Sequence, residues 1–579
     1  MKRVNATSVV LSQRINAGRT KVGPARYYTF RPCNQTRKSP RPNTSTIHFF
    51  ADEFYIRMAS TSRILWADDE IDLLRPHILF LESRGFEVTS VTNGRDAIEH
   101  VREGRCDLVL LDEQMPGMGG LEALTAIKDL ASDLPVVMIT KSEEERIMEE
   151  ALGGKISDYL TKPVNPSQVL LTCKRILDGR RIKTEAASQN YLQSFGEISS
   201  ALMNPLNHAD WTALYERLIK YDVELGGDEG VRQVLEDQYQ EANRAFSKYV
   251  EDEYKGWIAA TDTAPDEHRP VMSHEVVGKW VVPELANKKP VIFFVIDCMR
   301  YDQWLEFEQL LAPLFSLEKD YHYSILPTAT PYSRNSIFAG LLPADIAREY
   351  PRIWAAGEDD EHSRNRNEEE FLNQFLKRRH LNTRVRYDKL IGSRDGKEFQ
   401  SSVHDLLQSD LSAVVVNFVD ILAHSRSDSP VLKEIAPDER AYRALTRTWF
   451  EHSWLYSAFQ QLAETDCTII VTTDHGAIRS LHGTKVIGDR ETSTALRYKY
   501  GRNLKCDGRH AIFVKNPADY GLPGDSRNTN FIIAKEDYYF VYPTNYHHYL
   551  NKYRDTMQHG GVSMEEMILP VITMRPKKS

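Results

Sequence analysis

The sequence predicts a multidomain α/β protein in which two α/β parts are joined by a helical part. Short apolar segments alternate with helical segments from residue 61 to about 165, and further apolar segments end in carboxylates after residue 286. Between them, apolar residues recur with helical spacing and without a strand pattern. A chain of 579 residues is also too long for one hydrophobic core, so several domains are expected.

The composition indicates a globular protein of the cytoplasm. Hydrophobic residues make up 41% of the chain and charged residues 27%, and no apolar run is long enough to predict membrane insertion. The six cysteines lack the paired spacing of a disulfide framework or a thiolate zinc site, which favours a reducing cytoplasmic location. A net charge of −9 argues against binding to duplex DNA.

Residues 1–57 differ from the rest of the chain. They contain 11 Lys and Arg residues but only two acids, Asp52 and Glu53, and they show no apolar periodicity. Organelle transit peptides share this Arg-rich, acid-poor character. Because the pattern of an ordered domain starts directly after Met58, we predict that residues 1–57 are a disordered or non-native N-terminal extension.

The first α/β domain is expected at residues 61–180. Five short apolar strands separated by helices predict a parallel, doubly wound sheet, in which ligands bind at the carboxyl ends of the strands. The residues at these ends are Asp68, Asp69, Asp112, Thr140 and Lys162. Clustered carboxylates require a divalent cation, and hard oxygen ligands suit Mg²⁺. Asp112 is then a candidate nucleophile toward a phosphoryl donor, with Thr140 and Lys162 contacting the phosphoryl oxygens.

This domain resembles the flavodoxin-like receiver domain of two-component response regulators. The resemblance implies that a sensor histidine kinase phosphorylates Asp112 and that the phosphorylated protein forms a homodimer. It also implies that Asp68 and Asp69 form an acidic Mg²⁺ pocket. Tyr159 matches the aromatic residue that turns inward when Thr140 contacts the phosphoryl group.

Residues 181–285 are predicted to form a helical bundle linker. Asp210 is a candidate N-cap of the helix that begins at Trp211. Aromatic side chains along these helices are expected in the core, with docking of a partner protein as the alternative. We interpret the region as a mechanical connection between the two α/β domains.

Residues 286–579 are predicted to form the second α/β domain. Carboxylates and imidazoles cluster near the ends of its apolar strands, at Asp297, Asp420, His424, Asp474, His475 and His559. Strands of one parallel sheet would bring these side chains to a common rim. Three carboxylates at one rim are costly without cations, and mixed carboxylate and imidazole ligands suit Zn²⁺ or Mn²⁺. The pattern therefore predicts two divalent ions.

A threonine between the first two of these strands is a candidate nucleophile. Thr330 precedes Pro331 at the start of a predicted helix. A hydroxyl at a helix N-terminus and beside a metal ion loses its proton more readily and can attack phosphorus. Two ions would stabilise the attacking and leaving oxygens together.

Residues 290–575 resemble the PglZ branch of the alkaline phosphatase superfamily, on the segments PTATPYSRNSIFAGLLP and TTDHG. The resemblance implies that Thr330 is the nucleophile, with Thr328 as the alternative, and that two Zn²⁺ ions are bound. The implied ligands of the first ion are Asp297, Thr330, Asp474 and His475. The implied ligands of the second ion are Asp420, His424 and His559. A further histidine, His482, is expected to be structural.

The order of receiver, helical linker and PglZ domain resembles the PorX-type response regulators. This resemblance implies a phosphorylation-controlled, zinc-dependent phosphodiesterase that acts on small nucleotide or oligonucleotide phosphodiesters. It also implies regulation of type IX secretion, with a component of the secretion machinery or a sigma factor as partner. The alternative is a non-enzymatic docking platform with structural zinc ions. A DNA-binding transcription factor is disfavoured because no basic stripe or helix-turn-helix pattern follows the receiver.

The sequence leaves open whether the ester is a monoester or a diester. A monoesterase needs additional positive charge for the free phosphoryl oxygens. Arg300, Arg334 and Lys485 are the candidates for this charge.

Overall fold

The computed structural model describes residues 62–104, 106–131, 133–140, 156–225, 229–260, 269–355, 365–488, 495–524 and 529–577. The predicted extension 1–57 lies outside the described residues.

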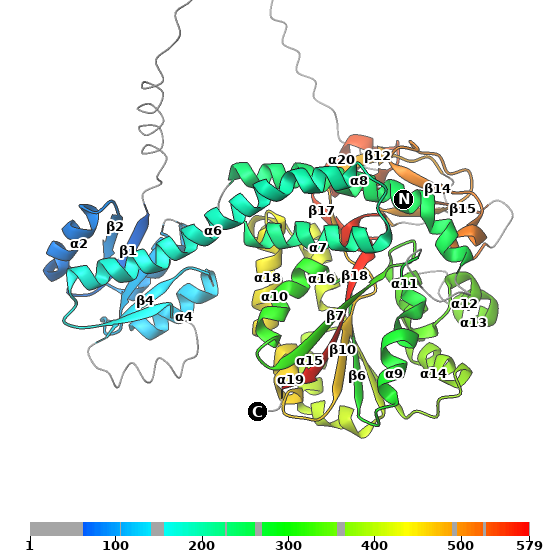
Figure 1. The fold of residues 1–579 in the computed structure, drawn as a ribbon, viewed down its shortest axis with the longest axis horizontal. Helices are drawn as coiled ribbons and strands as arrows, with labels where there is room; N and C mark the ends of the chain where they lie inside the picture. Colours follow the sequence, from blue (N-terminus) through cyan, green and yellow to red (C-terminus); the bar gives the residue numbers. More distant parts are fainter. Residues whose placement is uncertain are drawn as a thin grey trace, which may run out of the picture. The chain divides into compact units, whose positions relative to one another are not determined.

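The first α/β domain contains a five-stranded parallel sheet with the strand order β2-β1-β3-β4-β5 (Figure 1). Its strands are β1 (Arg63–Ala67), β2 (Glu87–Val91), β3 (Leu108–Asp112), β4 (Val136–Thr140) and β5 (Asp158–Thr161). Its described helices are α2 (Arg75–Glu82), α3 (Gly94–Arg102) and α4 (Gly120–Leu130). Trp66 and Leu65 belong to separate apolar clusters, because consecutive strand residues point to opposite faces of the sheet. The predicted flavodoxin-like fold is confirmed.

Three helices form the linker: α6 (Pro166–Leu202), α7 (His208–Glu224) and α8 (Glu229–Ala259). The first turns of α6 belong to the receiver, because Val169 and Cys173 pack in the core of its sheet. The helix then continues without interruption past residue 180, where we expected the domain boundary. The buried aromatic residues Trp211 and Phe246 contact each other edge to face, in a core that is shared with the second α/β domain.

The predicted N-cap of α7 was wrong. Asn207 caps the helix, since its side-chain oxygen accepts hydrogen bonds from the backbone of Ala209 and Asp210. Asp210 lies three residues later and accepts a hydrogen bond from the backbone nitrogen of Asn207 at 3.0 Å. Asn and Asp are both favourable N-cap residues. In the capping box that they form here, Asn207 is the N-cap and Asp210 is the third helical residue.

The second α/β domain is built on a six-stranded sheet with the order β7-β18-β10-β6-β9-β8. These strands are β6 (Val291–Ile296), β7 (Phe315–Tyr323), β8 (Val385–Leu390), β9 (Leu411–Val416), β10 (Thr468–Thr472) and β18 (Ile568–Pro576). The central strands β10, β6 and β9 are parallel neighbours, with Ile296 opposite Val416 and Val295 opposite Thr472. Their carboxyl ends therefore lie at the same level of one rim, as predicted.

Helices flank this sheet, and smaller sheets extend the domain (Figure 1). The helices are α9 (Val282–Leu285), α10 (Tyr301–Leu311), α11 (Thr330–Ala339), α12 (Pro343–Glu349), α13 (Pro351–Ala355), α14 (Glu368–Arg378), α15 (Ser393–Ser401), α16 (Phe418–Asp428), α17 (Pro430–Ile435), α18 (Glu439–Glu451), α19 (Trp454–Leu462), α20 (Tyr546–Tyr553) and α21 (Met564–Met567). The smaller sheets pair β11 (Ile478–Ser480) with β17 (Thr556–Gln558), β12 (His482–Lys485) with β16 (Tyr538–Val541), and β15 (Asn530–Ala534) with both β13 (Tyr498–Gly501) and β14 (Ala511–Val514). Among the described residues, no helix combines the length and the apolar character that a membrane span requires.

A buried ion pair joins the start of β13 to α21. Arg497 donates to both carboxylate oxygens of Glu566, at 3.0 and 2.6 Å, and both side chains are fully buried. Glu566 also accepts hydrogen bonds from the backbone of Gly561 at 2.8 Å and from the hydroxyl of Ser563 at 2.8 Å.

We expect Arg497→Met to lower the free energy of unfolding by about 3–5 kcal/mol, because it leaves the Glu566 carboxylate buried without its cation. Replacing both partners, Arg497→Met with Glu566→Gln, should cost less than the single change. Urea denaturation measures both. The exposed pair of Arg509 and Asp507 provides the control, and Arg509→Met should leave the midpoint unchanged. Equal midpoints for Arg497→Met and Arg509→Met would contradict the prediction.

Candidate functional site

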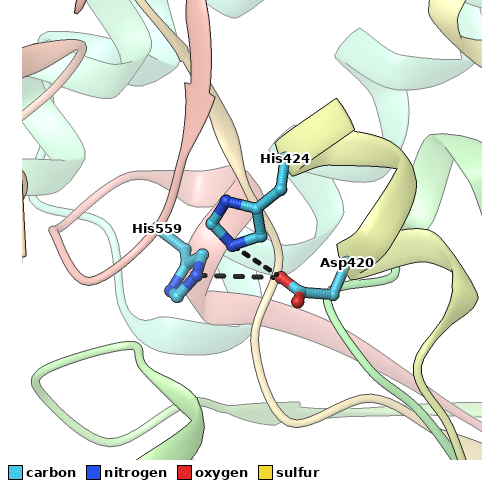
Figure 2. Close-up of side chains that lie close together, drawn as sticks. All are labelled: Asp420, His424 and His559. Carbon is cyan, nitrogen blue, oxygen red and sulfur yellow. Dashed lines mark ion pairs between the residues drawn. The ribbon is translucent and has the colours of Figure 1, made fainter. Parts of the chain in front are cut away.

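The rim of the second sheet collects the predicted acids and imidazoles from four places in the chain. Asp297 directly follows β6, and Asp474 and His475 follow β10. Asp420 and His424 lie four residues apart on α16 and therefore share one side of that helix. The sixth residue, His559, lies in the loop between β17 and α21 (Figure 2).

The first cluster consists of Asp297, Asp474 and His475, whose potential ligand atoms all lie within 4.8 Å of one another. The Nε2 atom of His475 is 3.7 Å from Asp297 Oδ1 and 3.7 Å from Asp474 Oδ2. Thr330, the first residue of α11, places its hydroxyl oxygen 2.9 Å from the same nitrogen. The Thr330 hydroxyl therefore lies next to the cluster of Asp297, Asp474 and His475, with which the family resemblance grouped it.

Contacts outside this cluster orient its ligand atoms. His475 Nδ1 donates to the carbonyl oxygen of Gly476 at 3.1 Å. Because the proton is then on Nδ1, Nε2 has a free lone pair that points toward the cluster. Asp474 Oδ1 accepts the backbone N–H of His475 at 3.1 Å, and Asp297 Oδ2 pairs with Arg334 at 2.7 Å. The remaining oxygens, Asp297 Oδ1 and Asp474 Oδ2, are buried and have no hydrogen-bond donor within the described part of the chain.

The second cluster consists of Asp420, His424 and His559 (Figure 2). Asp420 Oδ1 lies 3.4 Å from His424 Nε2 and 3.8 Å from His559 Nε2. The ring of His559 stacks on that of His475, with centroids 4.3 Å apart and planes at 20°. This stacking brings the two clusters side by side.

The electrostatics of the two clusters differ: burial opposes ionisation of the first cluster's carboxyls, whereas imidazoles stabilise the ionised carboxylate of the second. Burial raises the pKa of Asp297 to about 7 and also raises the pKa of Asp474, whereas burial lowers the pKa of His475. Burial likewise opposes ionisation of Asp420, but the hydrogen bond from His424 and the nearby imidazoles outweigh it and lower the pKa of that carboxyl. Divalent cations would stabilise the ionised carboxylates and require neutral imidazoles as ligands.

The separations fit metal coordination. In tetrahedral zinc sites with bonds of about 2.0–2.1 Å, ligand atoms lie about 3.3 Å apart. The measured separations of 3.4–3.8 Å in the two clusters are close to this value. Carboxylate oxygens without donors, together with imidazoles held in one orientation, are suitable ligands for divalent transition metals.

The receiver brings its predicted residues together at the carboxyl ends of β1, β3 and β5. Potential ligand atoms of Asp68, Asp69 and Asp112 lie within 4.8 Å of one another. Lys162 Nζ is 3.0 Å from Asp68 Oδ2 and 2.9 Å from Asp112 Oδ1. Asp112 Oδ2 is buried and has no donor in the described residues, and burial raises the pKa of this carboxyl. The arrangement suits a hard divalent cation beside an acceptor carboxylate.

The predicted receiver residues Thr140 and Tyr159 lie on the two neighbouring strands. Thr140 is the last residue of β4 and is fully buried, and Asp112 is paired with the residue before it, Ile139. Tyr159 lies in β5 opposite Met138 and packs, partly buried, against one apolar cluster of the receiver.

The structure separates the alternatives that the sequence left open. Thr328, the alternative nucleophile, is fully buried and donates to the carbonyl of Gly561 at 2.8 Å, so its hydroxyl belongs to a loop contact. His482 is exposed and pairs with Asp537 at 2.8 Å. Lys485 lies over the ring of Tyr546, 5.0 Å from its centroid.

The two candidate arginines already have carboxylate partners. Arg300 pairs with Asp302 at 2.6 Å and with Glu439 at 2.5 Å. Arg334 pairs with Asp297 at 2.7 Å and with Glu368 at 2.6 Å. Both arginines are almost fully buried, so neither points a free guanidinium group into solvent.

Sequence reasoning missed the residues that hold the clusters in place. Glu368 fixes Arg334 against Asp297, and Thr473 accepts from the backbone of Met299 at 3.1 Å and donates to the carbonyl of His475 at 2.8 Å. Glu368 lies in a run of three glutamates, which has the pattern of an exposed helix face. Thr473 stands next to a recognised ligand pair, and this adjacency was the available signal.

Comparison with known families supports the division of the chain into three parts. Residues 276–574 match the BREX system PglZ alkaline phosphatase-like domain. Residues 64–174 match the response regulator receiver domain, and residues 181–258 match the PorX response regulator linker domain.

Individual relatives match through the receiver. The transcriptional regulatory protein SrrA of Staphylococcus aureus (strain NCTC 8325 / PS 47) is 31% identical over 130 residues, which is 22% of this chain and 53% of SrrA. The chain thus spans about half the length of the curated relatives it matches. The chemotaxis protein CheY4 of Vibrio cholerae is 30% identical and matches 20% of this chain and 100% of its own, with a TM-score of 0.19. A CheY-like receiver protein of Methanospirillum hungatei JF-1 is 30% identical over 21% of this chain and 96% of its own, with a TM-score of 0.20.

The PglZ match covers more than half of the chain, and the receiver and linker matches precede it in the order that the fold shows. The chain therefore belongs to the PglZ alkaline phosphatase-like family, and it is a PorX-type response regulator in which a receiver domain is fused through a helical linker to a PglZ domain.

Proposed function

We propose that this response regulator is a phosphorylation-controlled phosphodiesterase whose PglZ domain uses two Zn²⁺ ions. The observation that carries the proposal is the position of Thr330, whose hydroxyl lies 2.9 Å from Nε2 of His475, a member of the first cluster. A hydroxyl at a helix N-terminus among metal ligands is suited to act as a nucleophile.

The residues of the two clusters are assigned as metal ligands, and Thr330 is also assigned as the nucleophile. Asp297, Thr330, Asp474 and His475 would hold one ion, and Asp420, His424 and His559 the other. When bound, the ions would stabilise charge on the attacking and leaving oxygens. The hydroxyl oxygen of Thr330 attacks phosphorus and loses its proton to solvent, and the leaving oxygen takes a proton from solvent and departs as an alcohol. Water then breaks the bond between phosphorus and Thr330, which releases the phosphomonoester and restores the hydroxyl.

The charge distribution favours a diester over a monoester. A monoester carries one more negative charge on its phosphoryl group and needs a free cation near it. Arg300 and Arg334, which were candidates for that cation, are buried and paired with carboxylates. Small phosphodiesters such as short oligonucleotides are therefore the substrates that we propose.

In this proposal, phosphorylation of the receiver domain regulates the activity of the PglZ domain. A sensor histidine kinase would phosphorylate Asp112, with Mg²⁺ held by Asp68, Asp69 and Asp112. Lys162 and Thr140 would contact the phosphoryl group, and Tyr159 would turn inward. We propose that phosphorylation favours a homodimer of this cytoplasmic protein and shifts the population of states in which the PglZ domain is active.

The match to the PorX linker domain extends the proposal to the physiological role. We propose that the protein regulates type IX secretion through a component of the secretion machinery or a sigma factor.

The nucleophile assignment predicts a large loss of activity for Thr330→Val. Without the hydroxyl, kcat/KM for bis-p-nitrophenyl phosphate with added zinc should fall by about a thousandfold or more, whereas Thr330→Ser should keep part of the activity. Thr448→Val is the matched control, because Thr448 is a helix threonine of α18 whose hydroxyl bonds to its own helix. Wild-type turnover by Thr330→Val would remove the assignment.

The metal assignment predicts that His424→Ala binds one zinc ion per chain where the wild-type protein binds two, because only the second cluster loses a ligand. Metal analysis by mass spectrometry after dialysis against buffer without chelator gives the stoichiometry. His482→Ala, the exposed control, should keep two ions. A wild-type protein without zinc, or an unchanged stoichiometry in His424→Ala, would contradict the assignment.

The receiver assignment predicts that Asp112→Asn neither incorporates phosphate from acetyl phosphate nor shifts toward a dimer, because an amide cannot form the acyl phosphate. Phosphoprotein gels and light scattering after size-exclusion chromatography detect the two effects. Asp107→Asn is the control, because Asp107 pairs with Arg63 on the surface of the same domain. A donor-dependent dimer of Asp112→Asn would refute this switch.

A further inference from the structure

The loop that carries His559 is held from two sides. On the side of the nucleophile segment, Thr328 accepts from the backbone of Gly560 at 3.1 Å and donates to the carbonyl of Gly561 at 2.8 Å. On the other side, the segment Val562–Glu565 directly follows the loop and contacts the linker helix α8. The linker therefore contacts the chain three residues after a candidate metal ligand.

Two polar residues of α8 make these contacts. Asn243 Oδ1 accepts the backbone N–H of Met564 at 2.8 Å, and its amide nitrogen donates to both oxygens of Glu565, at 3.0 and 3.2 Å. Ser247 donates to the carbonyl of Val562 at 3.0 Å. Because the two residues are four positions apart, they lie on one side of the helix, and they are 5% and 1% exposed.

Hydrogen bonds add to apolar packing between α8 and this segment, because Phe246 and Val250 share a hydrophobic core with Val562 and Met564. A cavity of about 640 Å³ lies beside the contact, lined among others by Tyr239, Asn243, Arg300 and Glu565. Burial raises the pKa of Glu565 to about 7, although the hydrogen bond from Asn243 counteracts this. Loss of Asn243 would leave a buried acid and a backbone N–H without a partner, so the segment would have to move to find new ones.

Such a movement would reach the two metal clusters unequally. His559 belongs to the second cluster, where its Nε2 lies 3.8 Å from Asp420 Oδ1. The ligands of the first cluster follow β6 and β10 in the centre of the sheet, and none of them lies in the loop. A displaced loop therefore moves a ligand of the second ion directly. It reaches the first cluster indirectly, through the stacking of His559 on His475 and the hydrogen bond from the backbone of Gly476 to the carbonyl of Glu566 at 3.3 Å.

We propose that Asn243 and Ser247 of α8 are positioning residues for His559, so that the linker helix sets the affinity of the second cluster for its metal ion. The inference rests on the proposed metal centre and deepens it. The same helix is hydrogen-bonded to α6 through Gln238, which donates to the carbonyl of Phe195 at 3.2 Å and to the hydroxyl of Ser199 at 3.0 Å. If α6 moved and α8 moved with it, the position of His559 would change, and with it the affinity of the second cluster for its metal ion.

The test is calorimetric titration of Zn²⁺ into the metal-free full chain. Asn243→Leu should weaken binding of the second ion about tenfold or more and weaken binding of the first ion clearly less. Lys248→Met removes an exposed ion pair with Asp252 from the same helix without touching the loop or α6, and it should leave both affinities unchanged. Equal effects of the two variants, or equal losses at both ions, would reduce the role of Asn243 to general stability and overturn the proposal.

A second pair of variants keeps the test decisive if Asn243→Leu folds poorly. Ser247→Ala should weaken the second ion by about threefold, and Ser247→Thr, which restores a hydroxyl, should bind it as the wild type does. Amide hydrogen exchange in residues 560–565 should be faster in Ser247→Ala than in Ser247→Thr. Identical affinities and exchange rates in both variants would overturn the proposal.

His424→Ala separates this inference from the proposed function. If Asn243 acts through the second cluster, adding Asn243→Leu to His424→Ala should lower zinc binding clearly less than it does in the wild-type chain. An additive loss would overturn the positioning role while leaving the metal centre intact. A wild-type protein that takes up no second ion would instead refute the metal centre itself.

Discussion

The rest of the active region depends on one constraint, the parallel alignment of β10, β6 and β9. Their register brings the carboxylates that follow them to one level, where Asp297 and Asp474 are fully buried and Asp420 is partly buried. Burying several carboxylates together is costly, and a single guanidinium group, that of Arg334, offsets part of the cost at Asp297. The donor-free oxygens and the raised pKa values of Asp297 and Asp474 show that the compensation is incomplete. This residual charge is the physical reason why the rim suits divalent cations.

Arg334 contacts carboxylates of the protein itself. Its sequence context is compatible with a cation that meets substrate, but the structure gives it two carboxylates, Asp297 and Glu368, on the protein side. By engaging one oxygen of Asp297, it leaves the other oxygen directed toward His475. The guanidinium group of Arg334 therefore faces two protein carboxylates and fixes the orientation of Asp297.

The helical linker is more than a spacer between the receiver and the PglZ domain. Its aromatic residues share a hydrophobic core with the second sheet, and its buried polar residues Asn243 and Ser247 contact the segment beside His559. The linker thus has both a large apolar contact, which fixes its general position, and a small polar contact, which is sensitive to small displacements.

The sequence alone indicated the order of receiver, helical linker and second α/β domain, and it named the acids and imidazoles of both clusters, but it did not predict the antiparallel strands β7 and β18 of the second sheet. It could name the cluster residues because a strand of a parallel sheet carries its ligand at a fixed end, so that Asp112, Asp297 and Asp474 are recognisable from the apolar runs before them. Local patterns did not decide between Asn207 and Asp210 as a helix cap, or between Thr328 and Thr330 as a nucleophile, because both members of each pair have the right chemistry. Tertiary structure identified Asn207 as the cap and placed the hydroxyl of Thr330, not that of Thr328, beside His475, and it alone brought Glu368 to Arg334 and Asn243 to Glu565. Arg334 and Glu368 are 34 positions apart, and Asn243 and Glu565 are 322 positions apart. Local sequence periodicity does not predict which distant side chain will pair with a buried charged or polar group.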